Sequence, residues 1–295
     1  MSRSAPDAST RPARTAGRRF SVLACVGTSF TTWARGAPAF AVVSIVYQAP
    51  VIAALKLAGA GSAPSQLRSL ALGTGSVLLS LLSWNLSLGA VTFGVLEGLR
   101  GRRAPIGRCL GVAFRTLPRL FGISFRMALH LLLGGGLAVF VAAIVASLVP
   151  FGRARGESAF ASPGRLWLMG ALLGVALLEY LARFATSAPI AVVEGADHWD
   201  SMERSRRLSF GRRWVVGTTL FLVAAAPVGL SVWLAFYAHP SVEASRDTDV
   251  WTWIATAFDV LVVGPLVGVA VATIYHDLRR EREGVGADDL AGVFD

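Results

Sequence analysis

The amino-acid sequence predicts an all-α fold, a polytopic membrane helical bundle with six transmembrane helices and short cytoplasmic interfacial helices. The chain of 295 residues is 54% hydrophobic and only 16% charged, which is too apolar for a soluble domain of this length. Six apolar runs reach a length of about 20 residues, which a helix needs to cross the hydrocarbon core. Arginine is concentrated in alternate connections between these runs, as in loops on one side of a membrane.

The six runs follow one another along most of the chain. Their approximate bounds are Ala39–Ala58, Leu70–Leu96, Phe121–Val149, Leu166–Val193, Trp214–Ala238 and Trp251–Tyr275. Several exceed the length of a perpendicular span, so tilted or kinked helices are expected. The predicted domains are a disordered cytoplasmic tail over residues 1–19, which is rich in Ser, Pro and Arg, a six-span membrane domain over 20–284, and a cytoplasmic tail over 285–295.

The charge distribution predicts the orientation and the partners. Most arginines precede the first run, separate the second from the third and the fourth from the fifth, or follow the sixth. The positive-inside rule therefore places both termini in the cytoplasm. Lys56 is the only lysine, a bias typical of GC-rich bacterial genomes, so the predicted location is the bacterial inner membrane. Arginines beside apolar runs favour anionic lipid headgroups, or a membrane protein partner, over nucleic acid.

A common pattern marks the predicted cytoplasmic junctions. Each even-numbered run ends at an acidic residue, namely Glu97, Glu194 or Asp277. Each odd-numbered run is entered from an arginine-bearing segment with the character of an interfacial helix, namely 20–35, 105–119 or 201–213. Three weak repeats of an interfacial helix and a two-span hairpin explain this pattern. Any hairpin protein with arginine-rich inner loops explains it equally well.

The junction from Ala188 to Trp214 is the most informative stretch of the sequence. A short helix over Ser201–Phe210 is expected, with Asp200 as N-cap and Gly211 as the C′ residue. An acid at the end of a helix opposes the macrodipole unless a cation lies beside it. Glu194 is therefore expected within salt-bridge distance of a cytoplasmic arginine. The candidate arginines are Arg204, Arg207 and those between 100 and 119, and Arg212 is a further candidate functional residue of this junction.

Four charged residues fall inside the predicted spans. They are Arg126, Glu179, Arg183 and Asp259. Charges at membrane depth usually face a bundle interior, so one interpretation is a functional polar track in which Asp259 pairs with Arg126 or Arg183. The alternatives are structural charge pairing and, for Arg126, snorkelling of its side chain toward the inner face.

Two blocks of the sequence resemble the glycerophosphoryl diester phosphodiesterase membrane-domain family. The first contains Ala188-Pro189, Val192-Val193-Glu194, Ser201, Arg204-Ser205, Leu208, Gly211-Arg212 and Trp214. The second contains Gly264-Pro265-Leu266, Tyr275-His276-Asp277-Leu278-Arg279 and Arg282-Glu283-Gly284. His276 departs from the aromatic residue that is usual in the family. The resemblance implies a membrane domain without esterase activity, because no phosphodiesterase domain is recognisable here.

No catalytic, metal or cofactor motif is recognisable. The four histidines, His130, His198, His239 and His276, are scattered, and no pair of His or Cys has metal-ligand spacing. The sequence therefore predicts a non-enzymatic accessory or scaffold protein that engages anionic lipid or a membrane partner through its arginine-rich junctions. The alternative is a transporter or lipid-handling protein that uses the charges within the spans, and a membrane-embedded lipid enzyme is the third hypothesis.

Overall fold

The computed structural model describes the backbone of residues 20–59, 66–99, 102, 105–148, 163–236 and 248–284. All secondary-structure elements of these residues are helices. Their bounds are α1 Val22–Gly59, α2 Gln66–Leu99, α3 Ile106–Leu148, α4 Pro163–Phe184, α5 Ser187–Val193, α6 His198–Ser209, α7 Arg213–Phe236, α8 Thr248–Phe258, the π-helix η1 Asp259–Val263 and α9 Gly264–Glu283. The predicted tails, 1–19 and 285–295, lie outside the described residues.

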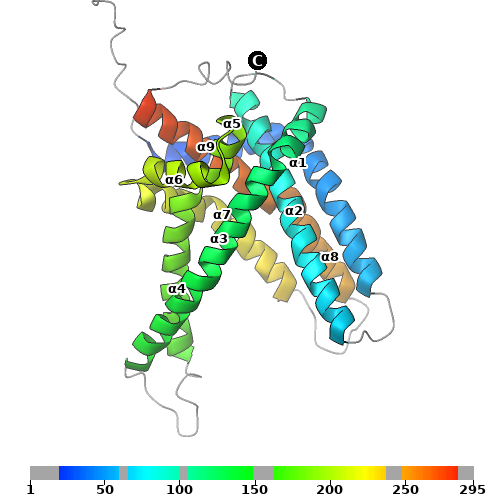
Figure 1. Ribbon diagram of the computed structural model, residues 1–295, viewed down its shortest axis with the longest axis vertical. Coiled ribbons are helices and arrows are strands. Elements are labelled where there is room, and N and C mark those ends of the chain that lie inside the picture. Colours follow the sequence, from blue (N-terminus) through cyan, green and yellow to red (C-terminus); the bar gives the residue numbers. More distant parts are fainter. Residues whose placement is uncertain are drawn as a thin grey trace, which may run out of the picture.

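The helices meet at one end of the molecule and spread apart toward the other (Figure 1). The short helices α5 and α6 and the end of α9 lie where the long helices converge. From there α3 and α4 extend to one side, whereas α1, α2 and α8 extend to the other. We refer to the converging end as the α6 end.

Five stretches of the described residues are long and apolar enough to cross a membrane. They are Val22–Ala53, Leu78–Leu99, Gly170–Val193, Arg213–Leu234 and Trp253–Glu283. The remaining expected span, Phe121–Val149, lies within α3, but most side chains beyond residue 136 are outside the described residues. The five spans support the predicted all-α membrane fold, and the sixth stays a prediction.

Two segments expected as separate interfacial helices are instead the first parts of long helices. Residues 22–35 belong to α1 and residues 106–119 belong to α3. Pro38 and Pro118 lie within these helices, and each removes a single backbone hydrogen bond, which permits a bend without ending the helix. The junction helix α6 alone is a separate element, so the structure differs here from the expectation.

Two expected spans are interrupted, and both interruptions precede a proline. The fourth run divides into α4 and α5 at Ala185 and Thr186, because Pro189 has no N–H to donate to the carbonyl of Ala185. The sixth run divides at η1, where the N–H of Gly264 donates to the carbonyl of Asp259. Pro265 lacks the next donor in the same way. Sequence reasoning treated both runs as continuous helices.

The short helix α5 forms the core of the α6 end. All seven of its residues, Ser187–Val193, are buried. Ile190 and Val193 pack with Leu96 of α2, Leu208 of α6 and Tyr275 of α9. The segment 187–193 is therefore buried by protein on every side. Because α5 packs against α6 and α9, the residue that follows it, Glu194, lies close to the charged side chains of these two helices.

Candidate functional site: a charged clasp between α6 and α9

The helix α6 begins and ends on local signals. Its N-cap is Asp197, whose carboxylate accepts a hydrogen bond from the N–H of His198 at 2.7 Å. The expected N-cap, Asp200, lies instead in the first turn, because the chain becomes helical three residues earlier. Gly211 has a φ of 75° and follows the C-cap Phe210, which confirms its prediction as the C′ residue.

A row of three buried serines attaches α6 to the rest of the α6 end. Ser201, Ser205 and Ser209 follow one another at a spacing of four residues and are almost completely buried. Ser205 and Ser209 donate to the carbonyl of Arg183 at 3.1 and 3.3 Å. The last carbonyls of α4 have no partner within that helix, and these two hydroxyls satisfy one of them, the carbonyl of Arg183. Sequence reasoning missed this row, although its helical spacing was visible.

Glu194 lies at the centre of a group of charged side chains from two helices. Its carboxylate forms a salt bridge with Arg204 of α6. It also accepts a hydrogen bond of 2.8 Å from the hydroxyl of Tyr275 on α9, and Arg279 lies 3.9 Å away. The expected contact between Glu194 and a junction arginine is therefore confirmed, with Arg204 as the partner.

Glu283 completes this group from the end of α9. It binds Arg204 at 2.8 Å through one carboxylate oxygen and Arg279 at 2.9 Å through the other, while Arg279 also donates to the Tyr275 hydroxyl at 3.0 Å. We call the five residues Glu194, Arg204, Tyr275, Arg279 and Glu283 the clasp. Two carboxylates and two guanidinium groups balance one another within it. The clasp connects α6 to α9 across a sequence separation of 79 residues.

The clasp stabilises the charged form of Arg204. Burial opposes the charge, but the hydrogen bond and charge of Glu194, with the charge of Glu283, outweigh it and raise the pKa of Arg204. On the exposed side of α6, the hydrogen bonds from Arg207 and Arg206 lower the pKa of the Glu203 carboxyl. Arg207 therefore contacts Glu203, at 3.0 Å, and does not contribute to the clasp.

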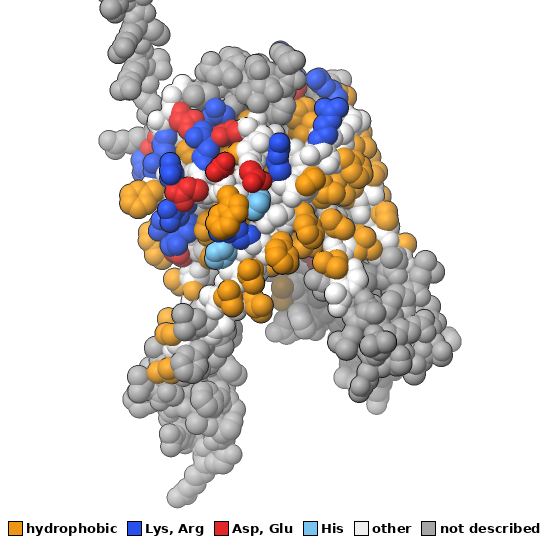
Figure 2. Space-filling model, viewed as in Figure 1, with side chains coloured by type: hydrophobic (Ala, Val, Ile, Leu, Met, Phe, Trp, Pro, Cys, Tyr) orange, Lys and Arg blue, Asp and Glu red, His pale blue; other side chains and the backbone are white. Residues whose placement is uncertain are grey.

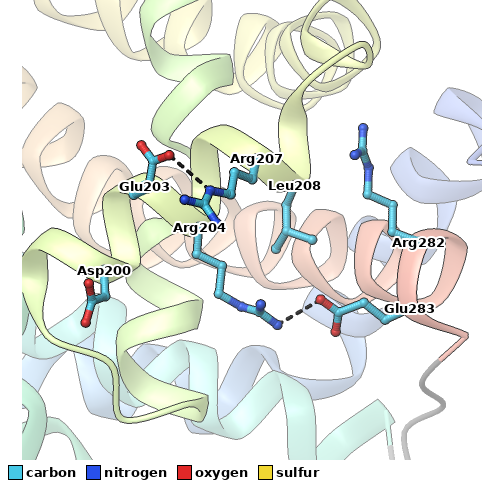
Figure 3. Close-up of a pocket in the computed structure, with 7 residues that line it drawn as sticks. All are labelled: Asp200, Glu203, Arg204, Arg207, Leu208, Arg282 and Glu283. Atoms are coloured by element: carbon cyan, nitrogen blue, oxygen red, sulfur yellow. Dashed lines mark hydrogen bonds and ion pairs between the residues drawn. The ribbon is translucent and has the colours of Figure 1, made fainter.

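A hollow of about 360 Å³ opens beside the clasp (Figure 3). It is lined by Asp200, Glu203, Arg204, Arg207, Leu208, Arg282 and Glu283. In Figure 3, Arg204 reaches from α6 toward Glu283, and Arg207 turns back to Glu203. Arginines and acids occur in equal number along the wall, so the hollow has no strong preference for one sign of charge.

Further contacts hold α7 and α9 at the same end. The candidate Arg212 binds Glu281 of α9 at 2.5 Å. Arg282 donates to the carbonyl of Phe210 in the turn between α6 and α7. Sequence reasoning missed Tyr275, Arg279, Glu281 and Glu283 as contact residues. Tyr275, Arg279 and Glu283 follow one another at a spacing of four residues, which places them on one face of α9 and could have predicted that they act together.

Three of the four charges expected within the membrane lie against α6 or its neighbours. Glu179 pairs with Arg183 at 2.8 Å, as the spacing of four residues suggested, and also with Arg213 of α7 at 3.4 Å. The guanidinium group of Arg126 lies over the ring of Trp199 in the first turn of α6. These contacts place the three charges at the α6 end and not in the middle of the bundle.

The expected pairing of Asp259 with Arg126 or Arg183 was wrong. Asp259 is exposed and begins η1, which packs against α1, α7, α8 and α9. Arg126 and Arg183 lie on α3 and α4 and have the other partners described above. The sequence shows only that these residues lie within apolar runs, and it does not show how far along the bundle axis each lies.

The other two junction acids have different surroundings from Glu194. Glu97 is buried at the end of α2, with 6% exposure. Asp277 pairs with the neighbouring His276 at 3.4 Å, and no arginine of the described residues forms a salt bridge with it. The junctions of Asp277 and Glu194 are therefore not equivalent in structure. Within the described ranges, no group of three His, Cys, Asp or Glu side chains is placed to hold a metal ion.

The first part of α3 carries exposed arginines that, unlike those of α6, form no salt bridge with another described residue. Arg102 precedes the helix, and Arg108, Arg115 and Arg119 lie exposed along it. None of the four forms a salt bridge with another described residue. We call these four residues the basic row. Figure 2 shows basic and acidic side chains intermixed at the upper left, over α6 and the end of α9, and mainly basic side chains toward the upper right.

The five apolar helices and the charged α6 end define a helical, multi-pass membrane protein. Comparison with known proteins found no matching family, curated protein or solved structure. The resemblance to the phosphodiesterase membrane-domain family therefore stays a prediction. All five residues that form the clasp come from the two blocks on which that resemblance is based.

Proposed function

We propose that this chain is a non-enzymatic accessory or scaffold protein of the bacterial inner membrane, with both termini on the cytoplasmic side. In this role α6 holds the inner ends of the membrane helices together through the clasp. The basic row on α3 engages anionic headgroups or a membrane partner. A membrane domain of this kind agrees with what the family resemblance implies.

The distribution of ion pairs is the observation that supports this proposal. Glu194, Glu203 and Glu283 each contact at least one arginine, so these carboxylates are engaged in structural pairing and are not left available for proton transfer. Among the described residues, no salt bridge joins the basic row to a carboxylate, although the charge of Arg119 acts on Asp197. An exposed arginine beside an anionic bilayer contributes on the order of 1 kcal/mol to the attraction.

The proposal is tested by the lipids that surround the protein. Membranes expressing the full chain are extracted with a styrene–maleic acid copolymer, and the co-purified lipids are quantified by mass spectrometry. The purified protein is expected to be enriched in phosphatidylglycerol and cardiolipin relative to the bulk membrane. The double variant Arg108→Gln/Arg115→Gln is expected to lose much of this enrichment.

The control variant Arg206→Gln/Arg207→Gln removes the same charge from α6, where both arginines already pair with Glu203. It is expected to retain more of the enrichment than the α3 variant. Equal enrichment in all three proteins would argue against a lipid-engaging surface on α3.

A transporter or lipid-handling role is the second candidate, and Asp259 is the observation that favours it. An ionisable residue within a membrane span, at a π-helical segment followed by Gly264 and Pro265, is a common feature of functional sites. If this role is correct, Asp259→Asn is expected to abolish a cellular phenotype of gene deletion that the wild-type chain restores, at unchanged expression. Full restoration by Asp259→Asn contradicts this alternative.

A further inference from the structure

The edge between α3 and α6 holds a cation whose hydrogen-bonding capacity is incompletely used. Nη1 of Arg126 is buried and has no hydrogen-bond partner among the described residues. An unsatisfied buried donor is costly, and more so when it is charged. The guanidinium face lies over Trp199, and Arg126 as a residue is only partly buried, so N–H groups other than Nη1 remain for an acceptor.

Other donors surround Arg126 on both helices. His130 lies one turn along α3, with its Nδ1 2.8 Å from the carbonyl of Arg126. His198 of α6 packs on Gly122, one turn before Arg126, since a Cβ added to this glycine would lie 3.2 Å from the His198 ring. Guanidinium and indole N–H groups are donors suited to a phosphate group, whereas each histidine ring already donates through Nδ1 and offers a second donor, at Nε2, only when it is protonated.

The nearby acids are already engaged. Asp197 accepts hydrogen bonds from the backbone and the ring of His198, and Glu179 pairs with Arg183 and Arg213. No carboxylate of the described residues pairs with Arg126. The charge of Arg126 is therefore not compensated by a direct ion pair, which favours a lipid with a net negative charge.

An apolar face continues along α3 from the same point. Phe125, Leu129 and Leu132 share one side of the helix and are 60%, 45% and 74% exposed. Arg126 and His130 occupy the adjacent side. This arrangement, a cation beside an aromatic side chain with an exposed apolar row leading away, has the form of a membrane interface.

We infer that the α3–α6 edge binds one anionic phospholipid, with its phosphate on Arg126 between His130 and Trp199 and an acyl chain along Phe125, Leu129 and Leu132. The site lies further along α3 than Arg108 and Arg115 of the basic row, and the inference rests on and deepens the proposed function by naming a ligand class and a position. The phosphate contacts the guanidinium group of Arg126, whose side chain is only partly buried. The lipid also fastens α3 to α6, which are otherwise joined by few polar contacts.

The site is tested by native mass spectrometry of the full chain, purified in detergent and titrated separately with phosphatidylglycerol and phosphatidylcholine. Wild-type protein is expected to bind the first phosphatidylglycerol more tightly than phosphatidylcholine. Arg126→Gln is expected to weaken phosphatidylglycerol binding roughly tenfold, the effect of losing one charge-assisted contact, with little effect on phosphatidylcholine. Arg126→Lys keeps the charge, and its affinity for phosphatidylglycerol is expected to lie between those of the wild-type protein and Arg126→Gln.

The matched control is Arg206→Gln, which removes one exposed charge from α6 away from the edge. It is expected to bind phosphatidylglycerol like the wild-type protein. Equal weakening in both Gln variants indicates general charge attraction and overturns the site. Soluble glycerol phosphate is expected to compete poorly, because it has no acyl chain. Competition at concentrations comparable to the lipid overturns the assignment of the apolar row.

A measurement on the wild-type chain avoids any effect of substitution on folding. A photoactivatable phosphatidylglycerol with its reactive group near the phosphate is expected to label peptides containing residues 122–133 and 198–203. Labelling confined to other helices overturns the site. The variant Arg108→Gln/Arg115→Gln leaves Arg126 in place. It is expected to lose the enrichment of anionic lipid but to keep the binding of this single lipid, so the proposed function and the lipid site can fail independently.

Discussion

Glu194 shows how one carboxylate organises several helices. Its partners come from α6 and α9, and the side chain retains 18% exposure. A carboxylate in this position loses part of its hydration, and charge-assisted hydrogen bonds from Arg204 and Tyr275 replace it. Removing one partner leaves the others with unsatisfied polar groups, so the members of the clasp are expected to be energetically coupled.

The Tyr275 hydroxyl provides a test of this coupling. Tyr275 is fully buried, and its hydroxyl donates to Glu194 and accepts from Arg279. Tyr275→Phe is expected to lower the free energy of unfolding by about 1–3 kcal/mol, because both partners lose a buried hydrogen bond. The measurement is reversible unfolding of the detergent-solubilised protein, combined with Glu194→Gln in a double-mutant cycle.

Tyr180→Phe is the control for this experiment, because it removes one hydroxyl that donates only to the carbonyl of Met127. Its effect is expected to be additive with Glu194→Gln. Additivity of Tyr275→Phe with Glu194→Gln would show that the clasp is not a coupled unit.

At the scale of an element, α6 is the helix that depends most on local capping. It has only 12 residues, and isolated helices of that length are marginally stable in water. Its stability therefore comes from the buried serine row, from the clasp and from the ends of the helix. The hydrogen bonds from His198 to Asp197 lower the pKa of this carboxyl, which shows that its ionised form is favoured in the folded protein.

The pH dependence of this cap follows from the direction of the shift. Because the pKa of Asp197 is lowered on folding, its ionised form stabilises α6 above the usual aspartate pKa of about 4, and this contribution is lost as the pH falls through the lower pKa of the folded state. At neutral pH, Asp197→Ala is expected to unfold at a lower temperature than wild type, and Asp197→Asn at an intermediate temperature. The difference between wild type and Asp197→Asn is expected to disappear in acid. A difference that grows on acidification contradicts this assignment.

The interruptions at Thr186 and η1 follow a common rule. In both, a proline four residues or fewer beyond the interruption lacks the N–H that a continuous helix needs. The same residue type within α1 and α3 does not end the helix. Surrounding packing decides between a bend and a break, because neighbouring helices provide other partners for the released carbonyl groups. The prolines were visible in the sequence, but the sequence analysis treated both runs as continuous, because local sequence does not show whether a proline bends or breaks a helix.

At the scale of the whole molecule, the ion pairs of the described residues are concentrated at the α6 end, whereas exposed apolar side chains continue along the long helices. Exposed apolar side chains such as Leu132, Phe221 and Trp233 lie along the long helices. This distribution suits a bilayer around the helices and water or headgroups around the α6 end. The positive-inside rule predicts that this end faces the cytoplasm.

Accessibility of a single cysteine tests the orientation. The native Cys25 and Cys109 are both buried, and Arg207 is 78% exposed. Arg207→Cys is expected to react with a membrane-impermeant maleimide in inside-out vesicles and to remain unlabelled in right-side-out vesicles. The wild-type chain serves as the control for background labelling. Labelling from the outer side alone reverses the predicted topology.

The sequence by itself determined the class of fold, the position of the α6 junction and the contact between Glu194 and a nearby arginine. These conclusions depend on local quantities: the length of apolar runs, the preference of glycine for a positive φ and the need of a helix-terminal acid for a cation. The tertiary structure alone decided that Tyr275, Arg279 and Glu283 complete the clasp, that α5 is buried by protein, and that Arg126 lies at the α6 end, apart from Asp259. Those facts depend on the depth and rotation of each helix, which are set by packing between residues far apart in the chain.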